Sequence, residues 1–229
     1  MYFRQFFDPV TSAMSYLLAD PVGREAALID PVREQVERDL ALVRELGLRL
    51  TAVLDTHTHA DHVTAAGALR AATGARTHAS AHGAPCVDRP LGHGAIVRVG
   101  ELAITALETP GHTDDSLSYA IPGAVFTGDA LLVRGCGRTD FQNGDAGALY
   151  DAITRVLFVL PDDTVVYPGH DYRGHTATTI GEEKRHNPRL AGRDRAAFCA
   201  LMGGLALPPP RRIAEAVPAN RACGALEVA

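Results

Sequence analysis

The sequence lacks several features that would place the protein in a special class. None of its apolar runs approaches the roughly 18 residues that a helix needs to cross a bilayer, so a membrane-spanning protein is not expected. It has only four cysteines, which are widely spaced and form no CxxC pair: Cys86, Cys136, Cys199 and Cys223. Such cysteines are typical of ordinary thiols in a reducing compartment. We therefore expect neither a disulfide framework nor a structural zinc ribbon.

The chain also lacks an excess of basic residues. Its 22 Lys and Arg stand against 27 Asp and Glu, giving a formal net charge of −5 at pH 7, so a nucleic acid partner is not expected. Apolar residues make up 46% and charged residues 21% of the 229 positions, as in soluble globular proteins. No repeat or Gly/Ser linker divides the chain, and its first residues do not resemble a signal or transit peptide. We expect one domain, 1–229, in the cytoplasm.

The first thirty residues alternate short apolar runs with turns. Three such runs end at the pairs Asp8-Pro9, Asp20-Pro21 and Asp30-Pro31. This pattern is typical of a small antiparallel meander. Asp30 is suited to cap a helix whose first residue is Pro31, and Gly47 is suited to end that helix.

Further along, strand and helix patterns recur. Apolar periodicity predicts helices over 62–73 and 146–160 and strands over 50–54, 75–80, 95–99, 102–108, 116–121, 124–128 and 164–167. The remainder, about 175–229, is expected to form a helical and coil extension packed on the same domain. The simplest layered arrangement is an α/β fold of two mixed sheets packed together with helices outside.

Three imidazoles and one carboxylate follow the first of these strands within six positions. They belong to His57, His59, Asp61 and His62. On a regular helix His57 and His59 would point about 200° apart, whereas in a loop they can converge. Neutral imidazole and carboxylate are usual ligands of zinc and non-haem iron. A solvated His-rich loop is the alternative, but the size of the cluster favours a metal site.

Three more candidate ligands each follow a predicted strand in a turn that contains glycine. His112 follows strand 102–108, Asp129 follows strand 124–128, and His170 follows strand 164–167. The neighbouring glycine permits a tight turn or a close backbone approach. Each could be a plain turn by itself, but together they repeat one arrangement of strand, glycine turn and ligand.

The HxHxDH segment 57–62, with His112, Asp129 and His170, resembles the metallo-β-lactamase superfamily. The resemblance implies an αββα sandwich with metal at one edge. Segments 135–142, 169–172, 182–190 and 216–224 resemble its persulfide dioxygenase (sulfur dioxygenase) family. Enzymes of that family oxidise glutathione persulfide with dioxygen and water to sulfite and glutathione, in the detoxification of sulfide.

The resemblance implies one Fe(II) per chain, bound by His57, His112 and Asp129. Two histidines and one carboxylate form the facial triad of Fe(II) oxygenases. Binuclear hydrolases of the superfamily bind a second metal at the positions of His59, Asp61, His62 and His170. In persulfide dioxygenases that second site is vacant and its residues orient the iron ligands. The sequence does not decide between the two states, because every ligand type is present.

The resemblance also implies which residues contact the substrate. Glutathione carries two carboxylates and an ammonium, and the implied contacts are Arg138, Tyr172 and Thr113, with the guanidinium suited to a carboxylate. A surface salt bridge is the alternative for Arg138, and a core position for Tyr172. Cys136 and Cys223 are candidates for a thiol role, although we favour a purely structural one.

Two other functions compete with the dioxygenase. A glyoxalase II-like hydroxyacylglutathione hydrolase with a binuclear metal site uses the same motif, with Asp129 bridging the metals. A metal-binding or redox-sensing module without turnover is the alternative from another class. The family resemblance further suggests a homodimer, and a rhodanese-type sulfurtransferase would be a separate chain.

Overall fold

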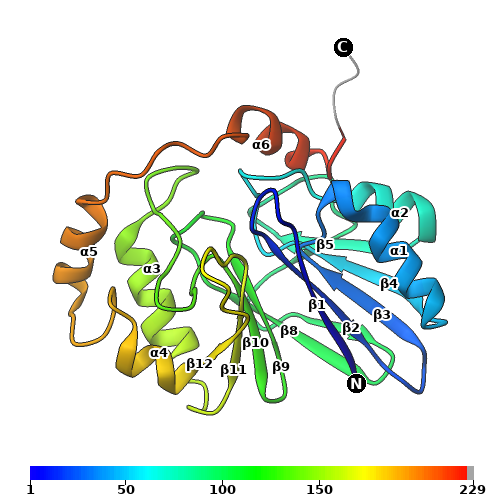
Figure 1. Cartoon of the computed structure of the whole chain (residues 1–229), viewed down its shortest axis with the longest axis horizontal. Helices are drawn as coiled ribbons and strands as arrows, with labels where there is room; N and C mark the ends of the chain where they lie inside the picture. The colour runs from blue at the N-terminus through cyan, green and yellow to red at the C-terminus, as the bar shows by residue number, and fades with distance from the viewer. Residues whose placement is uncertain (226–229) are drawn as a thin grey trace.

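The computed structural model describes residues 1–225 and packs two six-stranded sheets face to face between layers of helices (Figure 1). Helices α1 and α2 lie on one side of this sandwich, α3, α4 and α5 lie on the other, and α6 lies above the edge between them. This confirms the predicted αββα arrangement. No helix within residues 1–225 is both long and apolar enough to cross a membrane.

The first sheet has the strand order β1-β2-β3-β4-β5-β6. Its strands are β1 (Tyr2–Phe7), β2 (Met14–Ala19), β3 (Glu25–Ile29), β4 (Arg49–Leu54), β5 (Arg76–Ser80) and β6 (Arg89–Leu91). The first three strands form the predicted antiparallel meander. Strands β3 to β6 run parallel to one another, so the sheet is mixed.

The second sheet has the order β12-β11-β10-β9-β8-β7. Its strands are β7 (Ile96–Val99), β8 (Leu102–Glu108), β9 (Leu117–Ile121), β10 (Ala124–Gly128), β11 (Val165–Pro168) and β12 (Thr178–Thr179). Two antiparallel steps lead from β8 through β9 to β10, and β11 is parallel to β10. Strands β8, β10 and β11 therefore run in the same direction and end at the same edge.

Three apolar clusters hold the layers together. Tyr16 and Phe126 belong to the cluster between the sheets, Leu69 to the cluster under α1 and α2, and Leu149 and Phe198 to the cluster under α3 and α5.

The helices are η1 (Arg33–Gln35), α1 (Val36–Glu45), α2 (Ala66–Thr73), α3 (Ala146–Ala152), the π-helical η2 (Ile153–Leu157), α4 (Ile180–His186), α5 (Arg195–Gly203) and α6 (Ile213–Arg221). The single-domain organisation stays a prediction, supported by the burial of Phe198 from the C-terminal extension; positions 226–229 lie outside the described residues.

Two helix starts differ from the sequence prediction. Asp30 is not a helix cap, because its φ is 49° and its carboxylate accepts hydrogen bonds from Thr56 instead. The first α-helix begins only at Val36, after the 3-10 turn. Helix α2 begins at Ala66 rather than at residue 62, since the residues before it form an irregular loop.

The prediction for the cysteines is wrong for one pair. Cys86 and Cys223 form a disulfide, with Cα atoms 5.8 Å apart and 137 residues of separation in sequence. Cys136 and Cys199 are free thiols, as expected. The disulfide could not be predicted from the sequence, because spacing along the chain does not show which cysteines the fold brings within bonding distance.

Removing this disulfide should destabilise the protein. Because the bond closes a loop of 137 residues, Cys86→Ser should lower the free energy of unfolding by about 2–5 kcal/mol. Urea denaturation without reductant measures the change, and Cys199→Ser is the matched control because Cys199 is a free thiol. Dithiothreitol should bring the wild type to the stability of Cys86→Ser. Equal stability of the two proteins without reductant would contradict a stabilising disulfide.

Candidate metal centre

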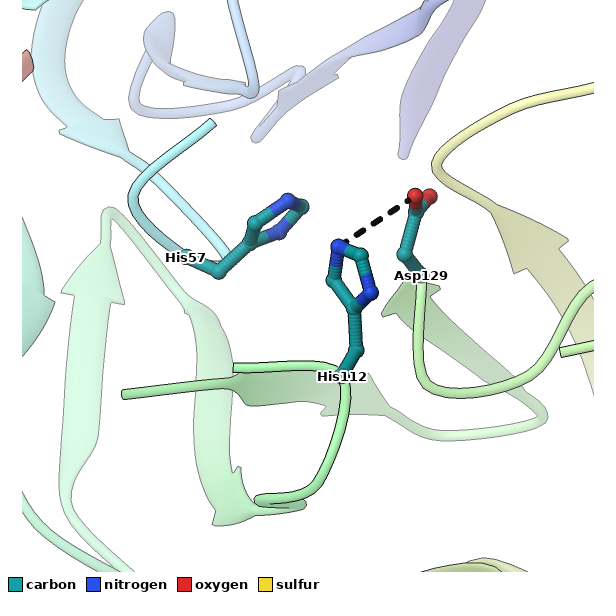
Figure 2. Close-up of side chains that lie close together, drawn as sticks. All are labelled: His57, His112 and Asp129. Atoms are coloured by element: carbon teal, nitrogen blue, oxygen red, sulfur yellow. Dashed lines mark ion pairs between the residues drawn. The ribbon is translucent and has the colours of Figure 1, made fainter. Parts of the chain in front are cut away.

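The predicted ligands converge at one edge of the sandwich, and they come from both sheets. His57 follows β4 of the first sheet, while His112, Asp129 and His170 follow β8, β10 and β11 of the second. Because β8, β10 and β11 end at the same edge, three loops from one sheet meet the loop that carries His57. Figure 2 shows His57, His112 and Asp129 pointing toward one another from three separate loops.

These three side chains form a set that can hold one metal ion. One ligand atom from each lies within 4.8 Å of the others. The Nε2 atom of His112 is 3.6 Å from Oδ2 of Asp129, and the rings of His57 and His112 meet edge to face at 4.9 Å between centroids. Two imidazoles and one carboxylate around a common point match the ligand set of a non-haem iron site.

A chain of hydrogen bonds from Asp30 through Thr56 orients the imidazole of His57. The hydroxyl of Thr56 donates to Oδ2 of Asp30 at 2.8 Å, so its oxygen accepts the N–H of His57 Nδ1 at 3.0 Å. This leaves Nε2 of His57 with its lone pair. Oδ1 of the same Asp30 accepts from the backbone N–H of Thr56 at 2.6 Å. Asp30 is thus a functional residue that sequence reasoning assigned to a helix cap.

A close backbone contact orients His112 in the same way. Nδ1 of His112 donates to the carbonyl of Arg138 at 2.7 Å, which leaves Nε2 free to bind a metal. The preceding Gly137 donates its N–H to the carbonyl of Asp129 at 2.6 Å. A Cβ on Gly137 would lie 2.6 Å from both that carbonyl and His112 Nδ1, so only glycine allows the approach.

The charges of the three residues suit metal binding. Burial, with the neighbouring His59 and His112, lowers the pKa of His57 well below its usual value and keeps the imidazole neutral. Burial alone would raise the pKa of Asp129, but the facing His170 holds it well below its usual range. The site therefore presents a neutral imidazole and an ionised carboxylate, the forms that bind metals.

A second set of donors lies beside the first. His59, Asp61 and His62 also place one ligand atom each within 4.8 Å of the others. Nδ1 of His59 and Nε2 of His62 are buried without a hydrogen-bond partner in residues 1–225. Nε2 of His59 faces Asp30 at 3.1 Å, and this carboxylate outweighs burial and raises the pKa of His59 to about 9.

His170 connects the two donor sets. Its Nδ1 lies 2.7 Å from Oδ1 of Asp129, and its Nε2 lies 3.0 Å from Oδ2 of Asp61. Burial opposes a charge on the ring, but the two carboxylates raise the pKa of His170 well above its usual value. In this arrangement both ring nitrogens donate hydrogen bonds.

Comparison with known proteins agrees with this geometry. The sequence pattern of the metallo-beta-lactamase superfamily matches residues 8–170. The chain is 45% identical over 224 residues to the human protein named persulfide dioxygenase ETHE1, mitochondrial, covering 96% of this chain and 88% of that protein. The chain belongs to the persulfide dioxygenase family of the metallo-β-lactamase superfamily.

Solved structures and a second group of relatives extend the comparison. The crystal structure of ETHE1 from Myxococcus xanthus is 61% identical and superposes with a TM-score of 0.98, covering 98% of this chain and 100% of that one. A hydroxyacylglutathione hydrolase from Polaromonas sp. is 42% identical over 165 residues, which cover 69% of this chain and 62% of that protein. The persulfide dioxygenases thus match over a larger share of the chain.

Within this family fold, Asp115 joins two ligand loops and was not predicted from the sequence. Its Oδ2 accepts from the N–H of Thr58 at 3.0 Å and from its hydroxyl at 2.6 Å. Its Oδ1 accepts from the hydroxyl of Thr113 at 2.5 Å. The loop that carries His57 is thereby fixed to the loop that carries His112. The adjacent acidic pair in the sequence, Asp114-Asp115, gave no sign of which carboxylate would be buried.

The residues implied to contact substrate lie in different settings. Arg138 forms a two-pronged ion pair with Asp140 at 2.7 and 2.8 Å and also donates to the carbonyls of Leu207 and Pro208. Tyr172 is 72% exposed, and its ring stacks on His170 at 5.9 Å. The hydroxyl of Thr113 is buried and already bonded to Asp115.

Of the two candidate thiols, neither is free at the surface. Cys136 is buried beside Arg189 and Met202, and burial raises the pKa of its thiol. A raised pKa lowers the thiolate fraction, which makes a thiol less reactive. Cys223 is in the disulfide with Cys86. A purely structural role for Cys136 and Cys223 stays a prediction, and Cys223 has it as half of a disulfide rather than as the expected free thiol.

Replacing Gly137 should weaken metal binding. In Gly137→Ala the added Cβ would collide with His112 Nδ1 and with the carbonyl of Asp129, displacing two ligands. We expect the affinity for Fe(II) or Co(II) to fall about tenfold or more. Competition with a chromophoric chelator measures it. Gly135→Ala is the matched control, because its Cβ would meet nothing closer than Leu132 at 3.9 Å. Wild-type affinity in Gly137→Ala would show that this close approach is not needed.

Proposed function

We propose that this chain is a persulfide dioxygenase that oxidises glutathione persulfide at a single Fe(II) bound by His57, His112 and Asp129. The main support for this proposal is the donor set itself. Hydrogen bonds orient the two imidazoles so that each Nε2 is free, and the carboxylate of Asp129 is ionised. Bound Fe(II) would supply open coordination positions and the electrons with which persulfide and dioxygen react. Membership of the family supports the same activity.

The chain's own residues supply position and charge. Oδ2 of Asp129 faces His112 and its Oδ1 is engaged by His170, so Oδ2 is the carboxylate oxygen that would hold Fe(II). Thr56 and the carbonyl of Arg138 hold the two imidazoles in the orientation that exposes Nε2. Such outer partners fix the ligands before iron binds, so less free energy is lost in ordering them.

The contacts of His170 support a one-metal site. Because both of its ring nitrogens donate to carboxylates, neither keeps a lone pair for a second metal. Its positive charge lies between Asp61 and Asp129, where it balances their negative charges. A second metal would have to displace His170 from Asp61.

Loss of Asp129 should abolish both iron binding and turnover. In Asp129→Ala the only carboxylate of the donor set is removed, so we expect iron content to fall from one per chain to near zero. Iron analysis and dioxygen uptake with freshly made glutathione persulfide, with sulfite as product, measure the two effects. Asp163→Ala, at an exposed aspartate, is the control. Stoichiometric iron in Asp129→Ala would remove Asp129 from the ligand set, and no dioxygen uptake by iron-loaded wild type would contradict the proposed activity.

We place the glutathione moiety beside the iron, near Arg138 and Tyr172. A cavity of about 340 Å³ is lined in part by Phe6, Met14 and Tyr172, and the ring of Tyr172 stacks on that of His170. The ion pair between Arg138 and Asp140 has the geometry with which a guanidinium binds a carboxylate. A carboxylate of the substrate would compete with Asp140 for it. A role for Thr113 would be indirect, through Asp115.

A substrate contact by Arg138 predicts a specific kinetic change. Arg138→Ala should raise KM for glutathione persulfide about tenfold or more with little change in kcat, because a contact present in both ground and transition states is lost. Steady-state dioxygen uptake measures both constants. Arg155→Ala, an exposed arginine, serves as the control. An unchanged KM together with a lower melting temperature would mean that Arg138 only holds the 207–208 segment.

A binuclear hydroxyacylglutathione hydrolase is the second candidate. The unpartnered Nε2 of His62 favours it, since Nδ1 of that ring faces Asp61 at 2.8 Å, and a metal would satisfy a buried nitrogen that is otherwise costly. The similarity to the Polaromonas hydrolase is a further reason to test it. Hydrolysis of S-lactoylglutathione by protein holding two metals per chain would support this function.

Several finer statements belong to the same proposal. We propose a cytoplasmic location, a homodimer, one domain and sulfur delivery by a separate rhodanese-type sulfurtransferase. The disulfide between Cys86 and Cys223 is unusual for a reducing compartment, so its redox state in cells bears directly on the proposed location.

A further inference from the structure

We propose that Asn220 of helix α6 is a positioning residue for the metal centre: its side-chain amide holds the backbone of the metal loop, residues 57–64, in the shape that aims its histidines. This inference rests on the proposed metal site. Asn220 touches neither the donor atoms nor the substrate cavity, and it acts through the loop alone.

Three hydrogen bonds of 2.8 Å join Asn220 to the metal loop. Its Nδ2 donates to the carbonyls of His59 and His62, and its Oδ1 accepts from the N–H of Thr64. Asn220 is only 4% exposed. Both amide hydrogens are used, so the amide cannot be turned around without placing like groups against each other.

The loop has no other means of satisfying these groups. Within residues 1–225, no other hydrogen bond reaches the carbonyls of His59 and His62 or the N–H of Thr64. An isolated bridge between Thr64 and Val32 pairs the neighbouring groups, Arg33 N–H with the carbonyl of Val63 and Ala65 N–H with the carbonyl of Pro31, but not the three groups that Asn220 binds. A buried backbone group without a partner is costly, and the loop would rearrange if the amide were removed.

Helix α6 gives Asn220 a fixed place from which to act. Cys223, three residues on, is bonded to Cys86, and its carbonyl accepts from the N–H of Gly67 at 2.8 Å. Val63 of the metal loop packs against Ala216 and Ala219 of the helix in a separate apolar cluster. The helix lies over the edge of the sandwich where the two sheets meet (Figure 1).

Helix α6 therefore controls how accurately the histidine side chains of the metal loop are positioned. The two carbonyls that Asn220 binds belong to His59 and His62, and His57 lies two residues before the first of them. A small shift of this backbone would move His57, the proposed iron ligand in this loop, together with His59 and His62 of the second donor set. Loss of a residue that orients metal ligands through hydrogen bonds typically lowers the metal affinity about 10–100-fold.

The experiment compares two kinds of variant in Co(II) titrations of the metal-free protein. Asn220→Ala removes all three hydrogen bonds, while Asn220→Asp keeps an acceptor for Thr64 and removes the two donors. We expect both to bind Co(II) about 10–100-fold more weakly and with altered visible absorption bands, which report ligand geometry. Glu215→Ala is the matched control, because it removes an exposed ion pair with Arg212 on the same helix and no hydrogen bond to the metal loop. It should keep wild-type Co(II) affinity and spectrum.

The Co(II) titrations distinguish failure of the Asn220 role from failure of the proposed metal site. Wild-type affinity and spectrum in both Asn220 variants would overturn the positioning role, as would an equal loss of affinity in Glu215→Ala. His57→Ala separates this failure from that of the metal site itself. If His57→Ala binds Co(II) as tightly as the wild type, the proposed iron site is wrong; if it loses binding while the Asn220 variants keep it, only the role of Asn220 is wrong.

Discussion

Hydrogen bonding of buried polar groups at the edge where the sheets meet is the constraint on which the rest of the structure depends. Imidazoles and carboxylates are concentrated there, and they are removed from water. Each must find a partner or a metal, because an unpaired buried charge is far more costly than a paired one. Asp30 and Asp115 meet this need by accepting hydrogen bonds from the loops that carry the ligands.

Local sequence patterns predicted the layers and the candidate ligands. Strand β8 shows a regular apolar alternation, and the glycine turns after β8, β10 and β11 mark where those strands end. His112 and Asp129 occupy such turns, and His57 follows an apolar strand, but it was the family resemblance that combined these three into one set. These features are local, because a strand and the turn that follows it are encoded by adjacent residues.

The partners of those ligands could not be predicted, because they come from distant parts of the chain. Asp30 looks like a helix cap by its neighbour Pro31, yet its carboxylate serves a loop 26 residues further on. Cys86 finds its partner 137 residues away. Asp140 is only two residues from Arg138, but the carbonyls that complete the contacts of that arginine follow about 70 residues later. Spacing rules carry no information about such contacts.

Because the proposed ligands come from both sheets, metal binding would be part of the fold. His57 extends from the first sheet, and His112 and Asp129 extend from the second, so a metal held by all three would join the two layers across their apolar interface. Hydrogen bonds also join the two sheets at this edge, because Asp115 fixes the loop after β8 to the loop after β4. Metal affinity and the packing of the sheets are therefore coupled: whatever displaces one layer also displaces part of the ligand set.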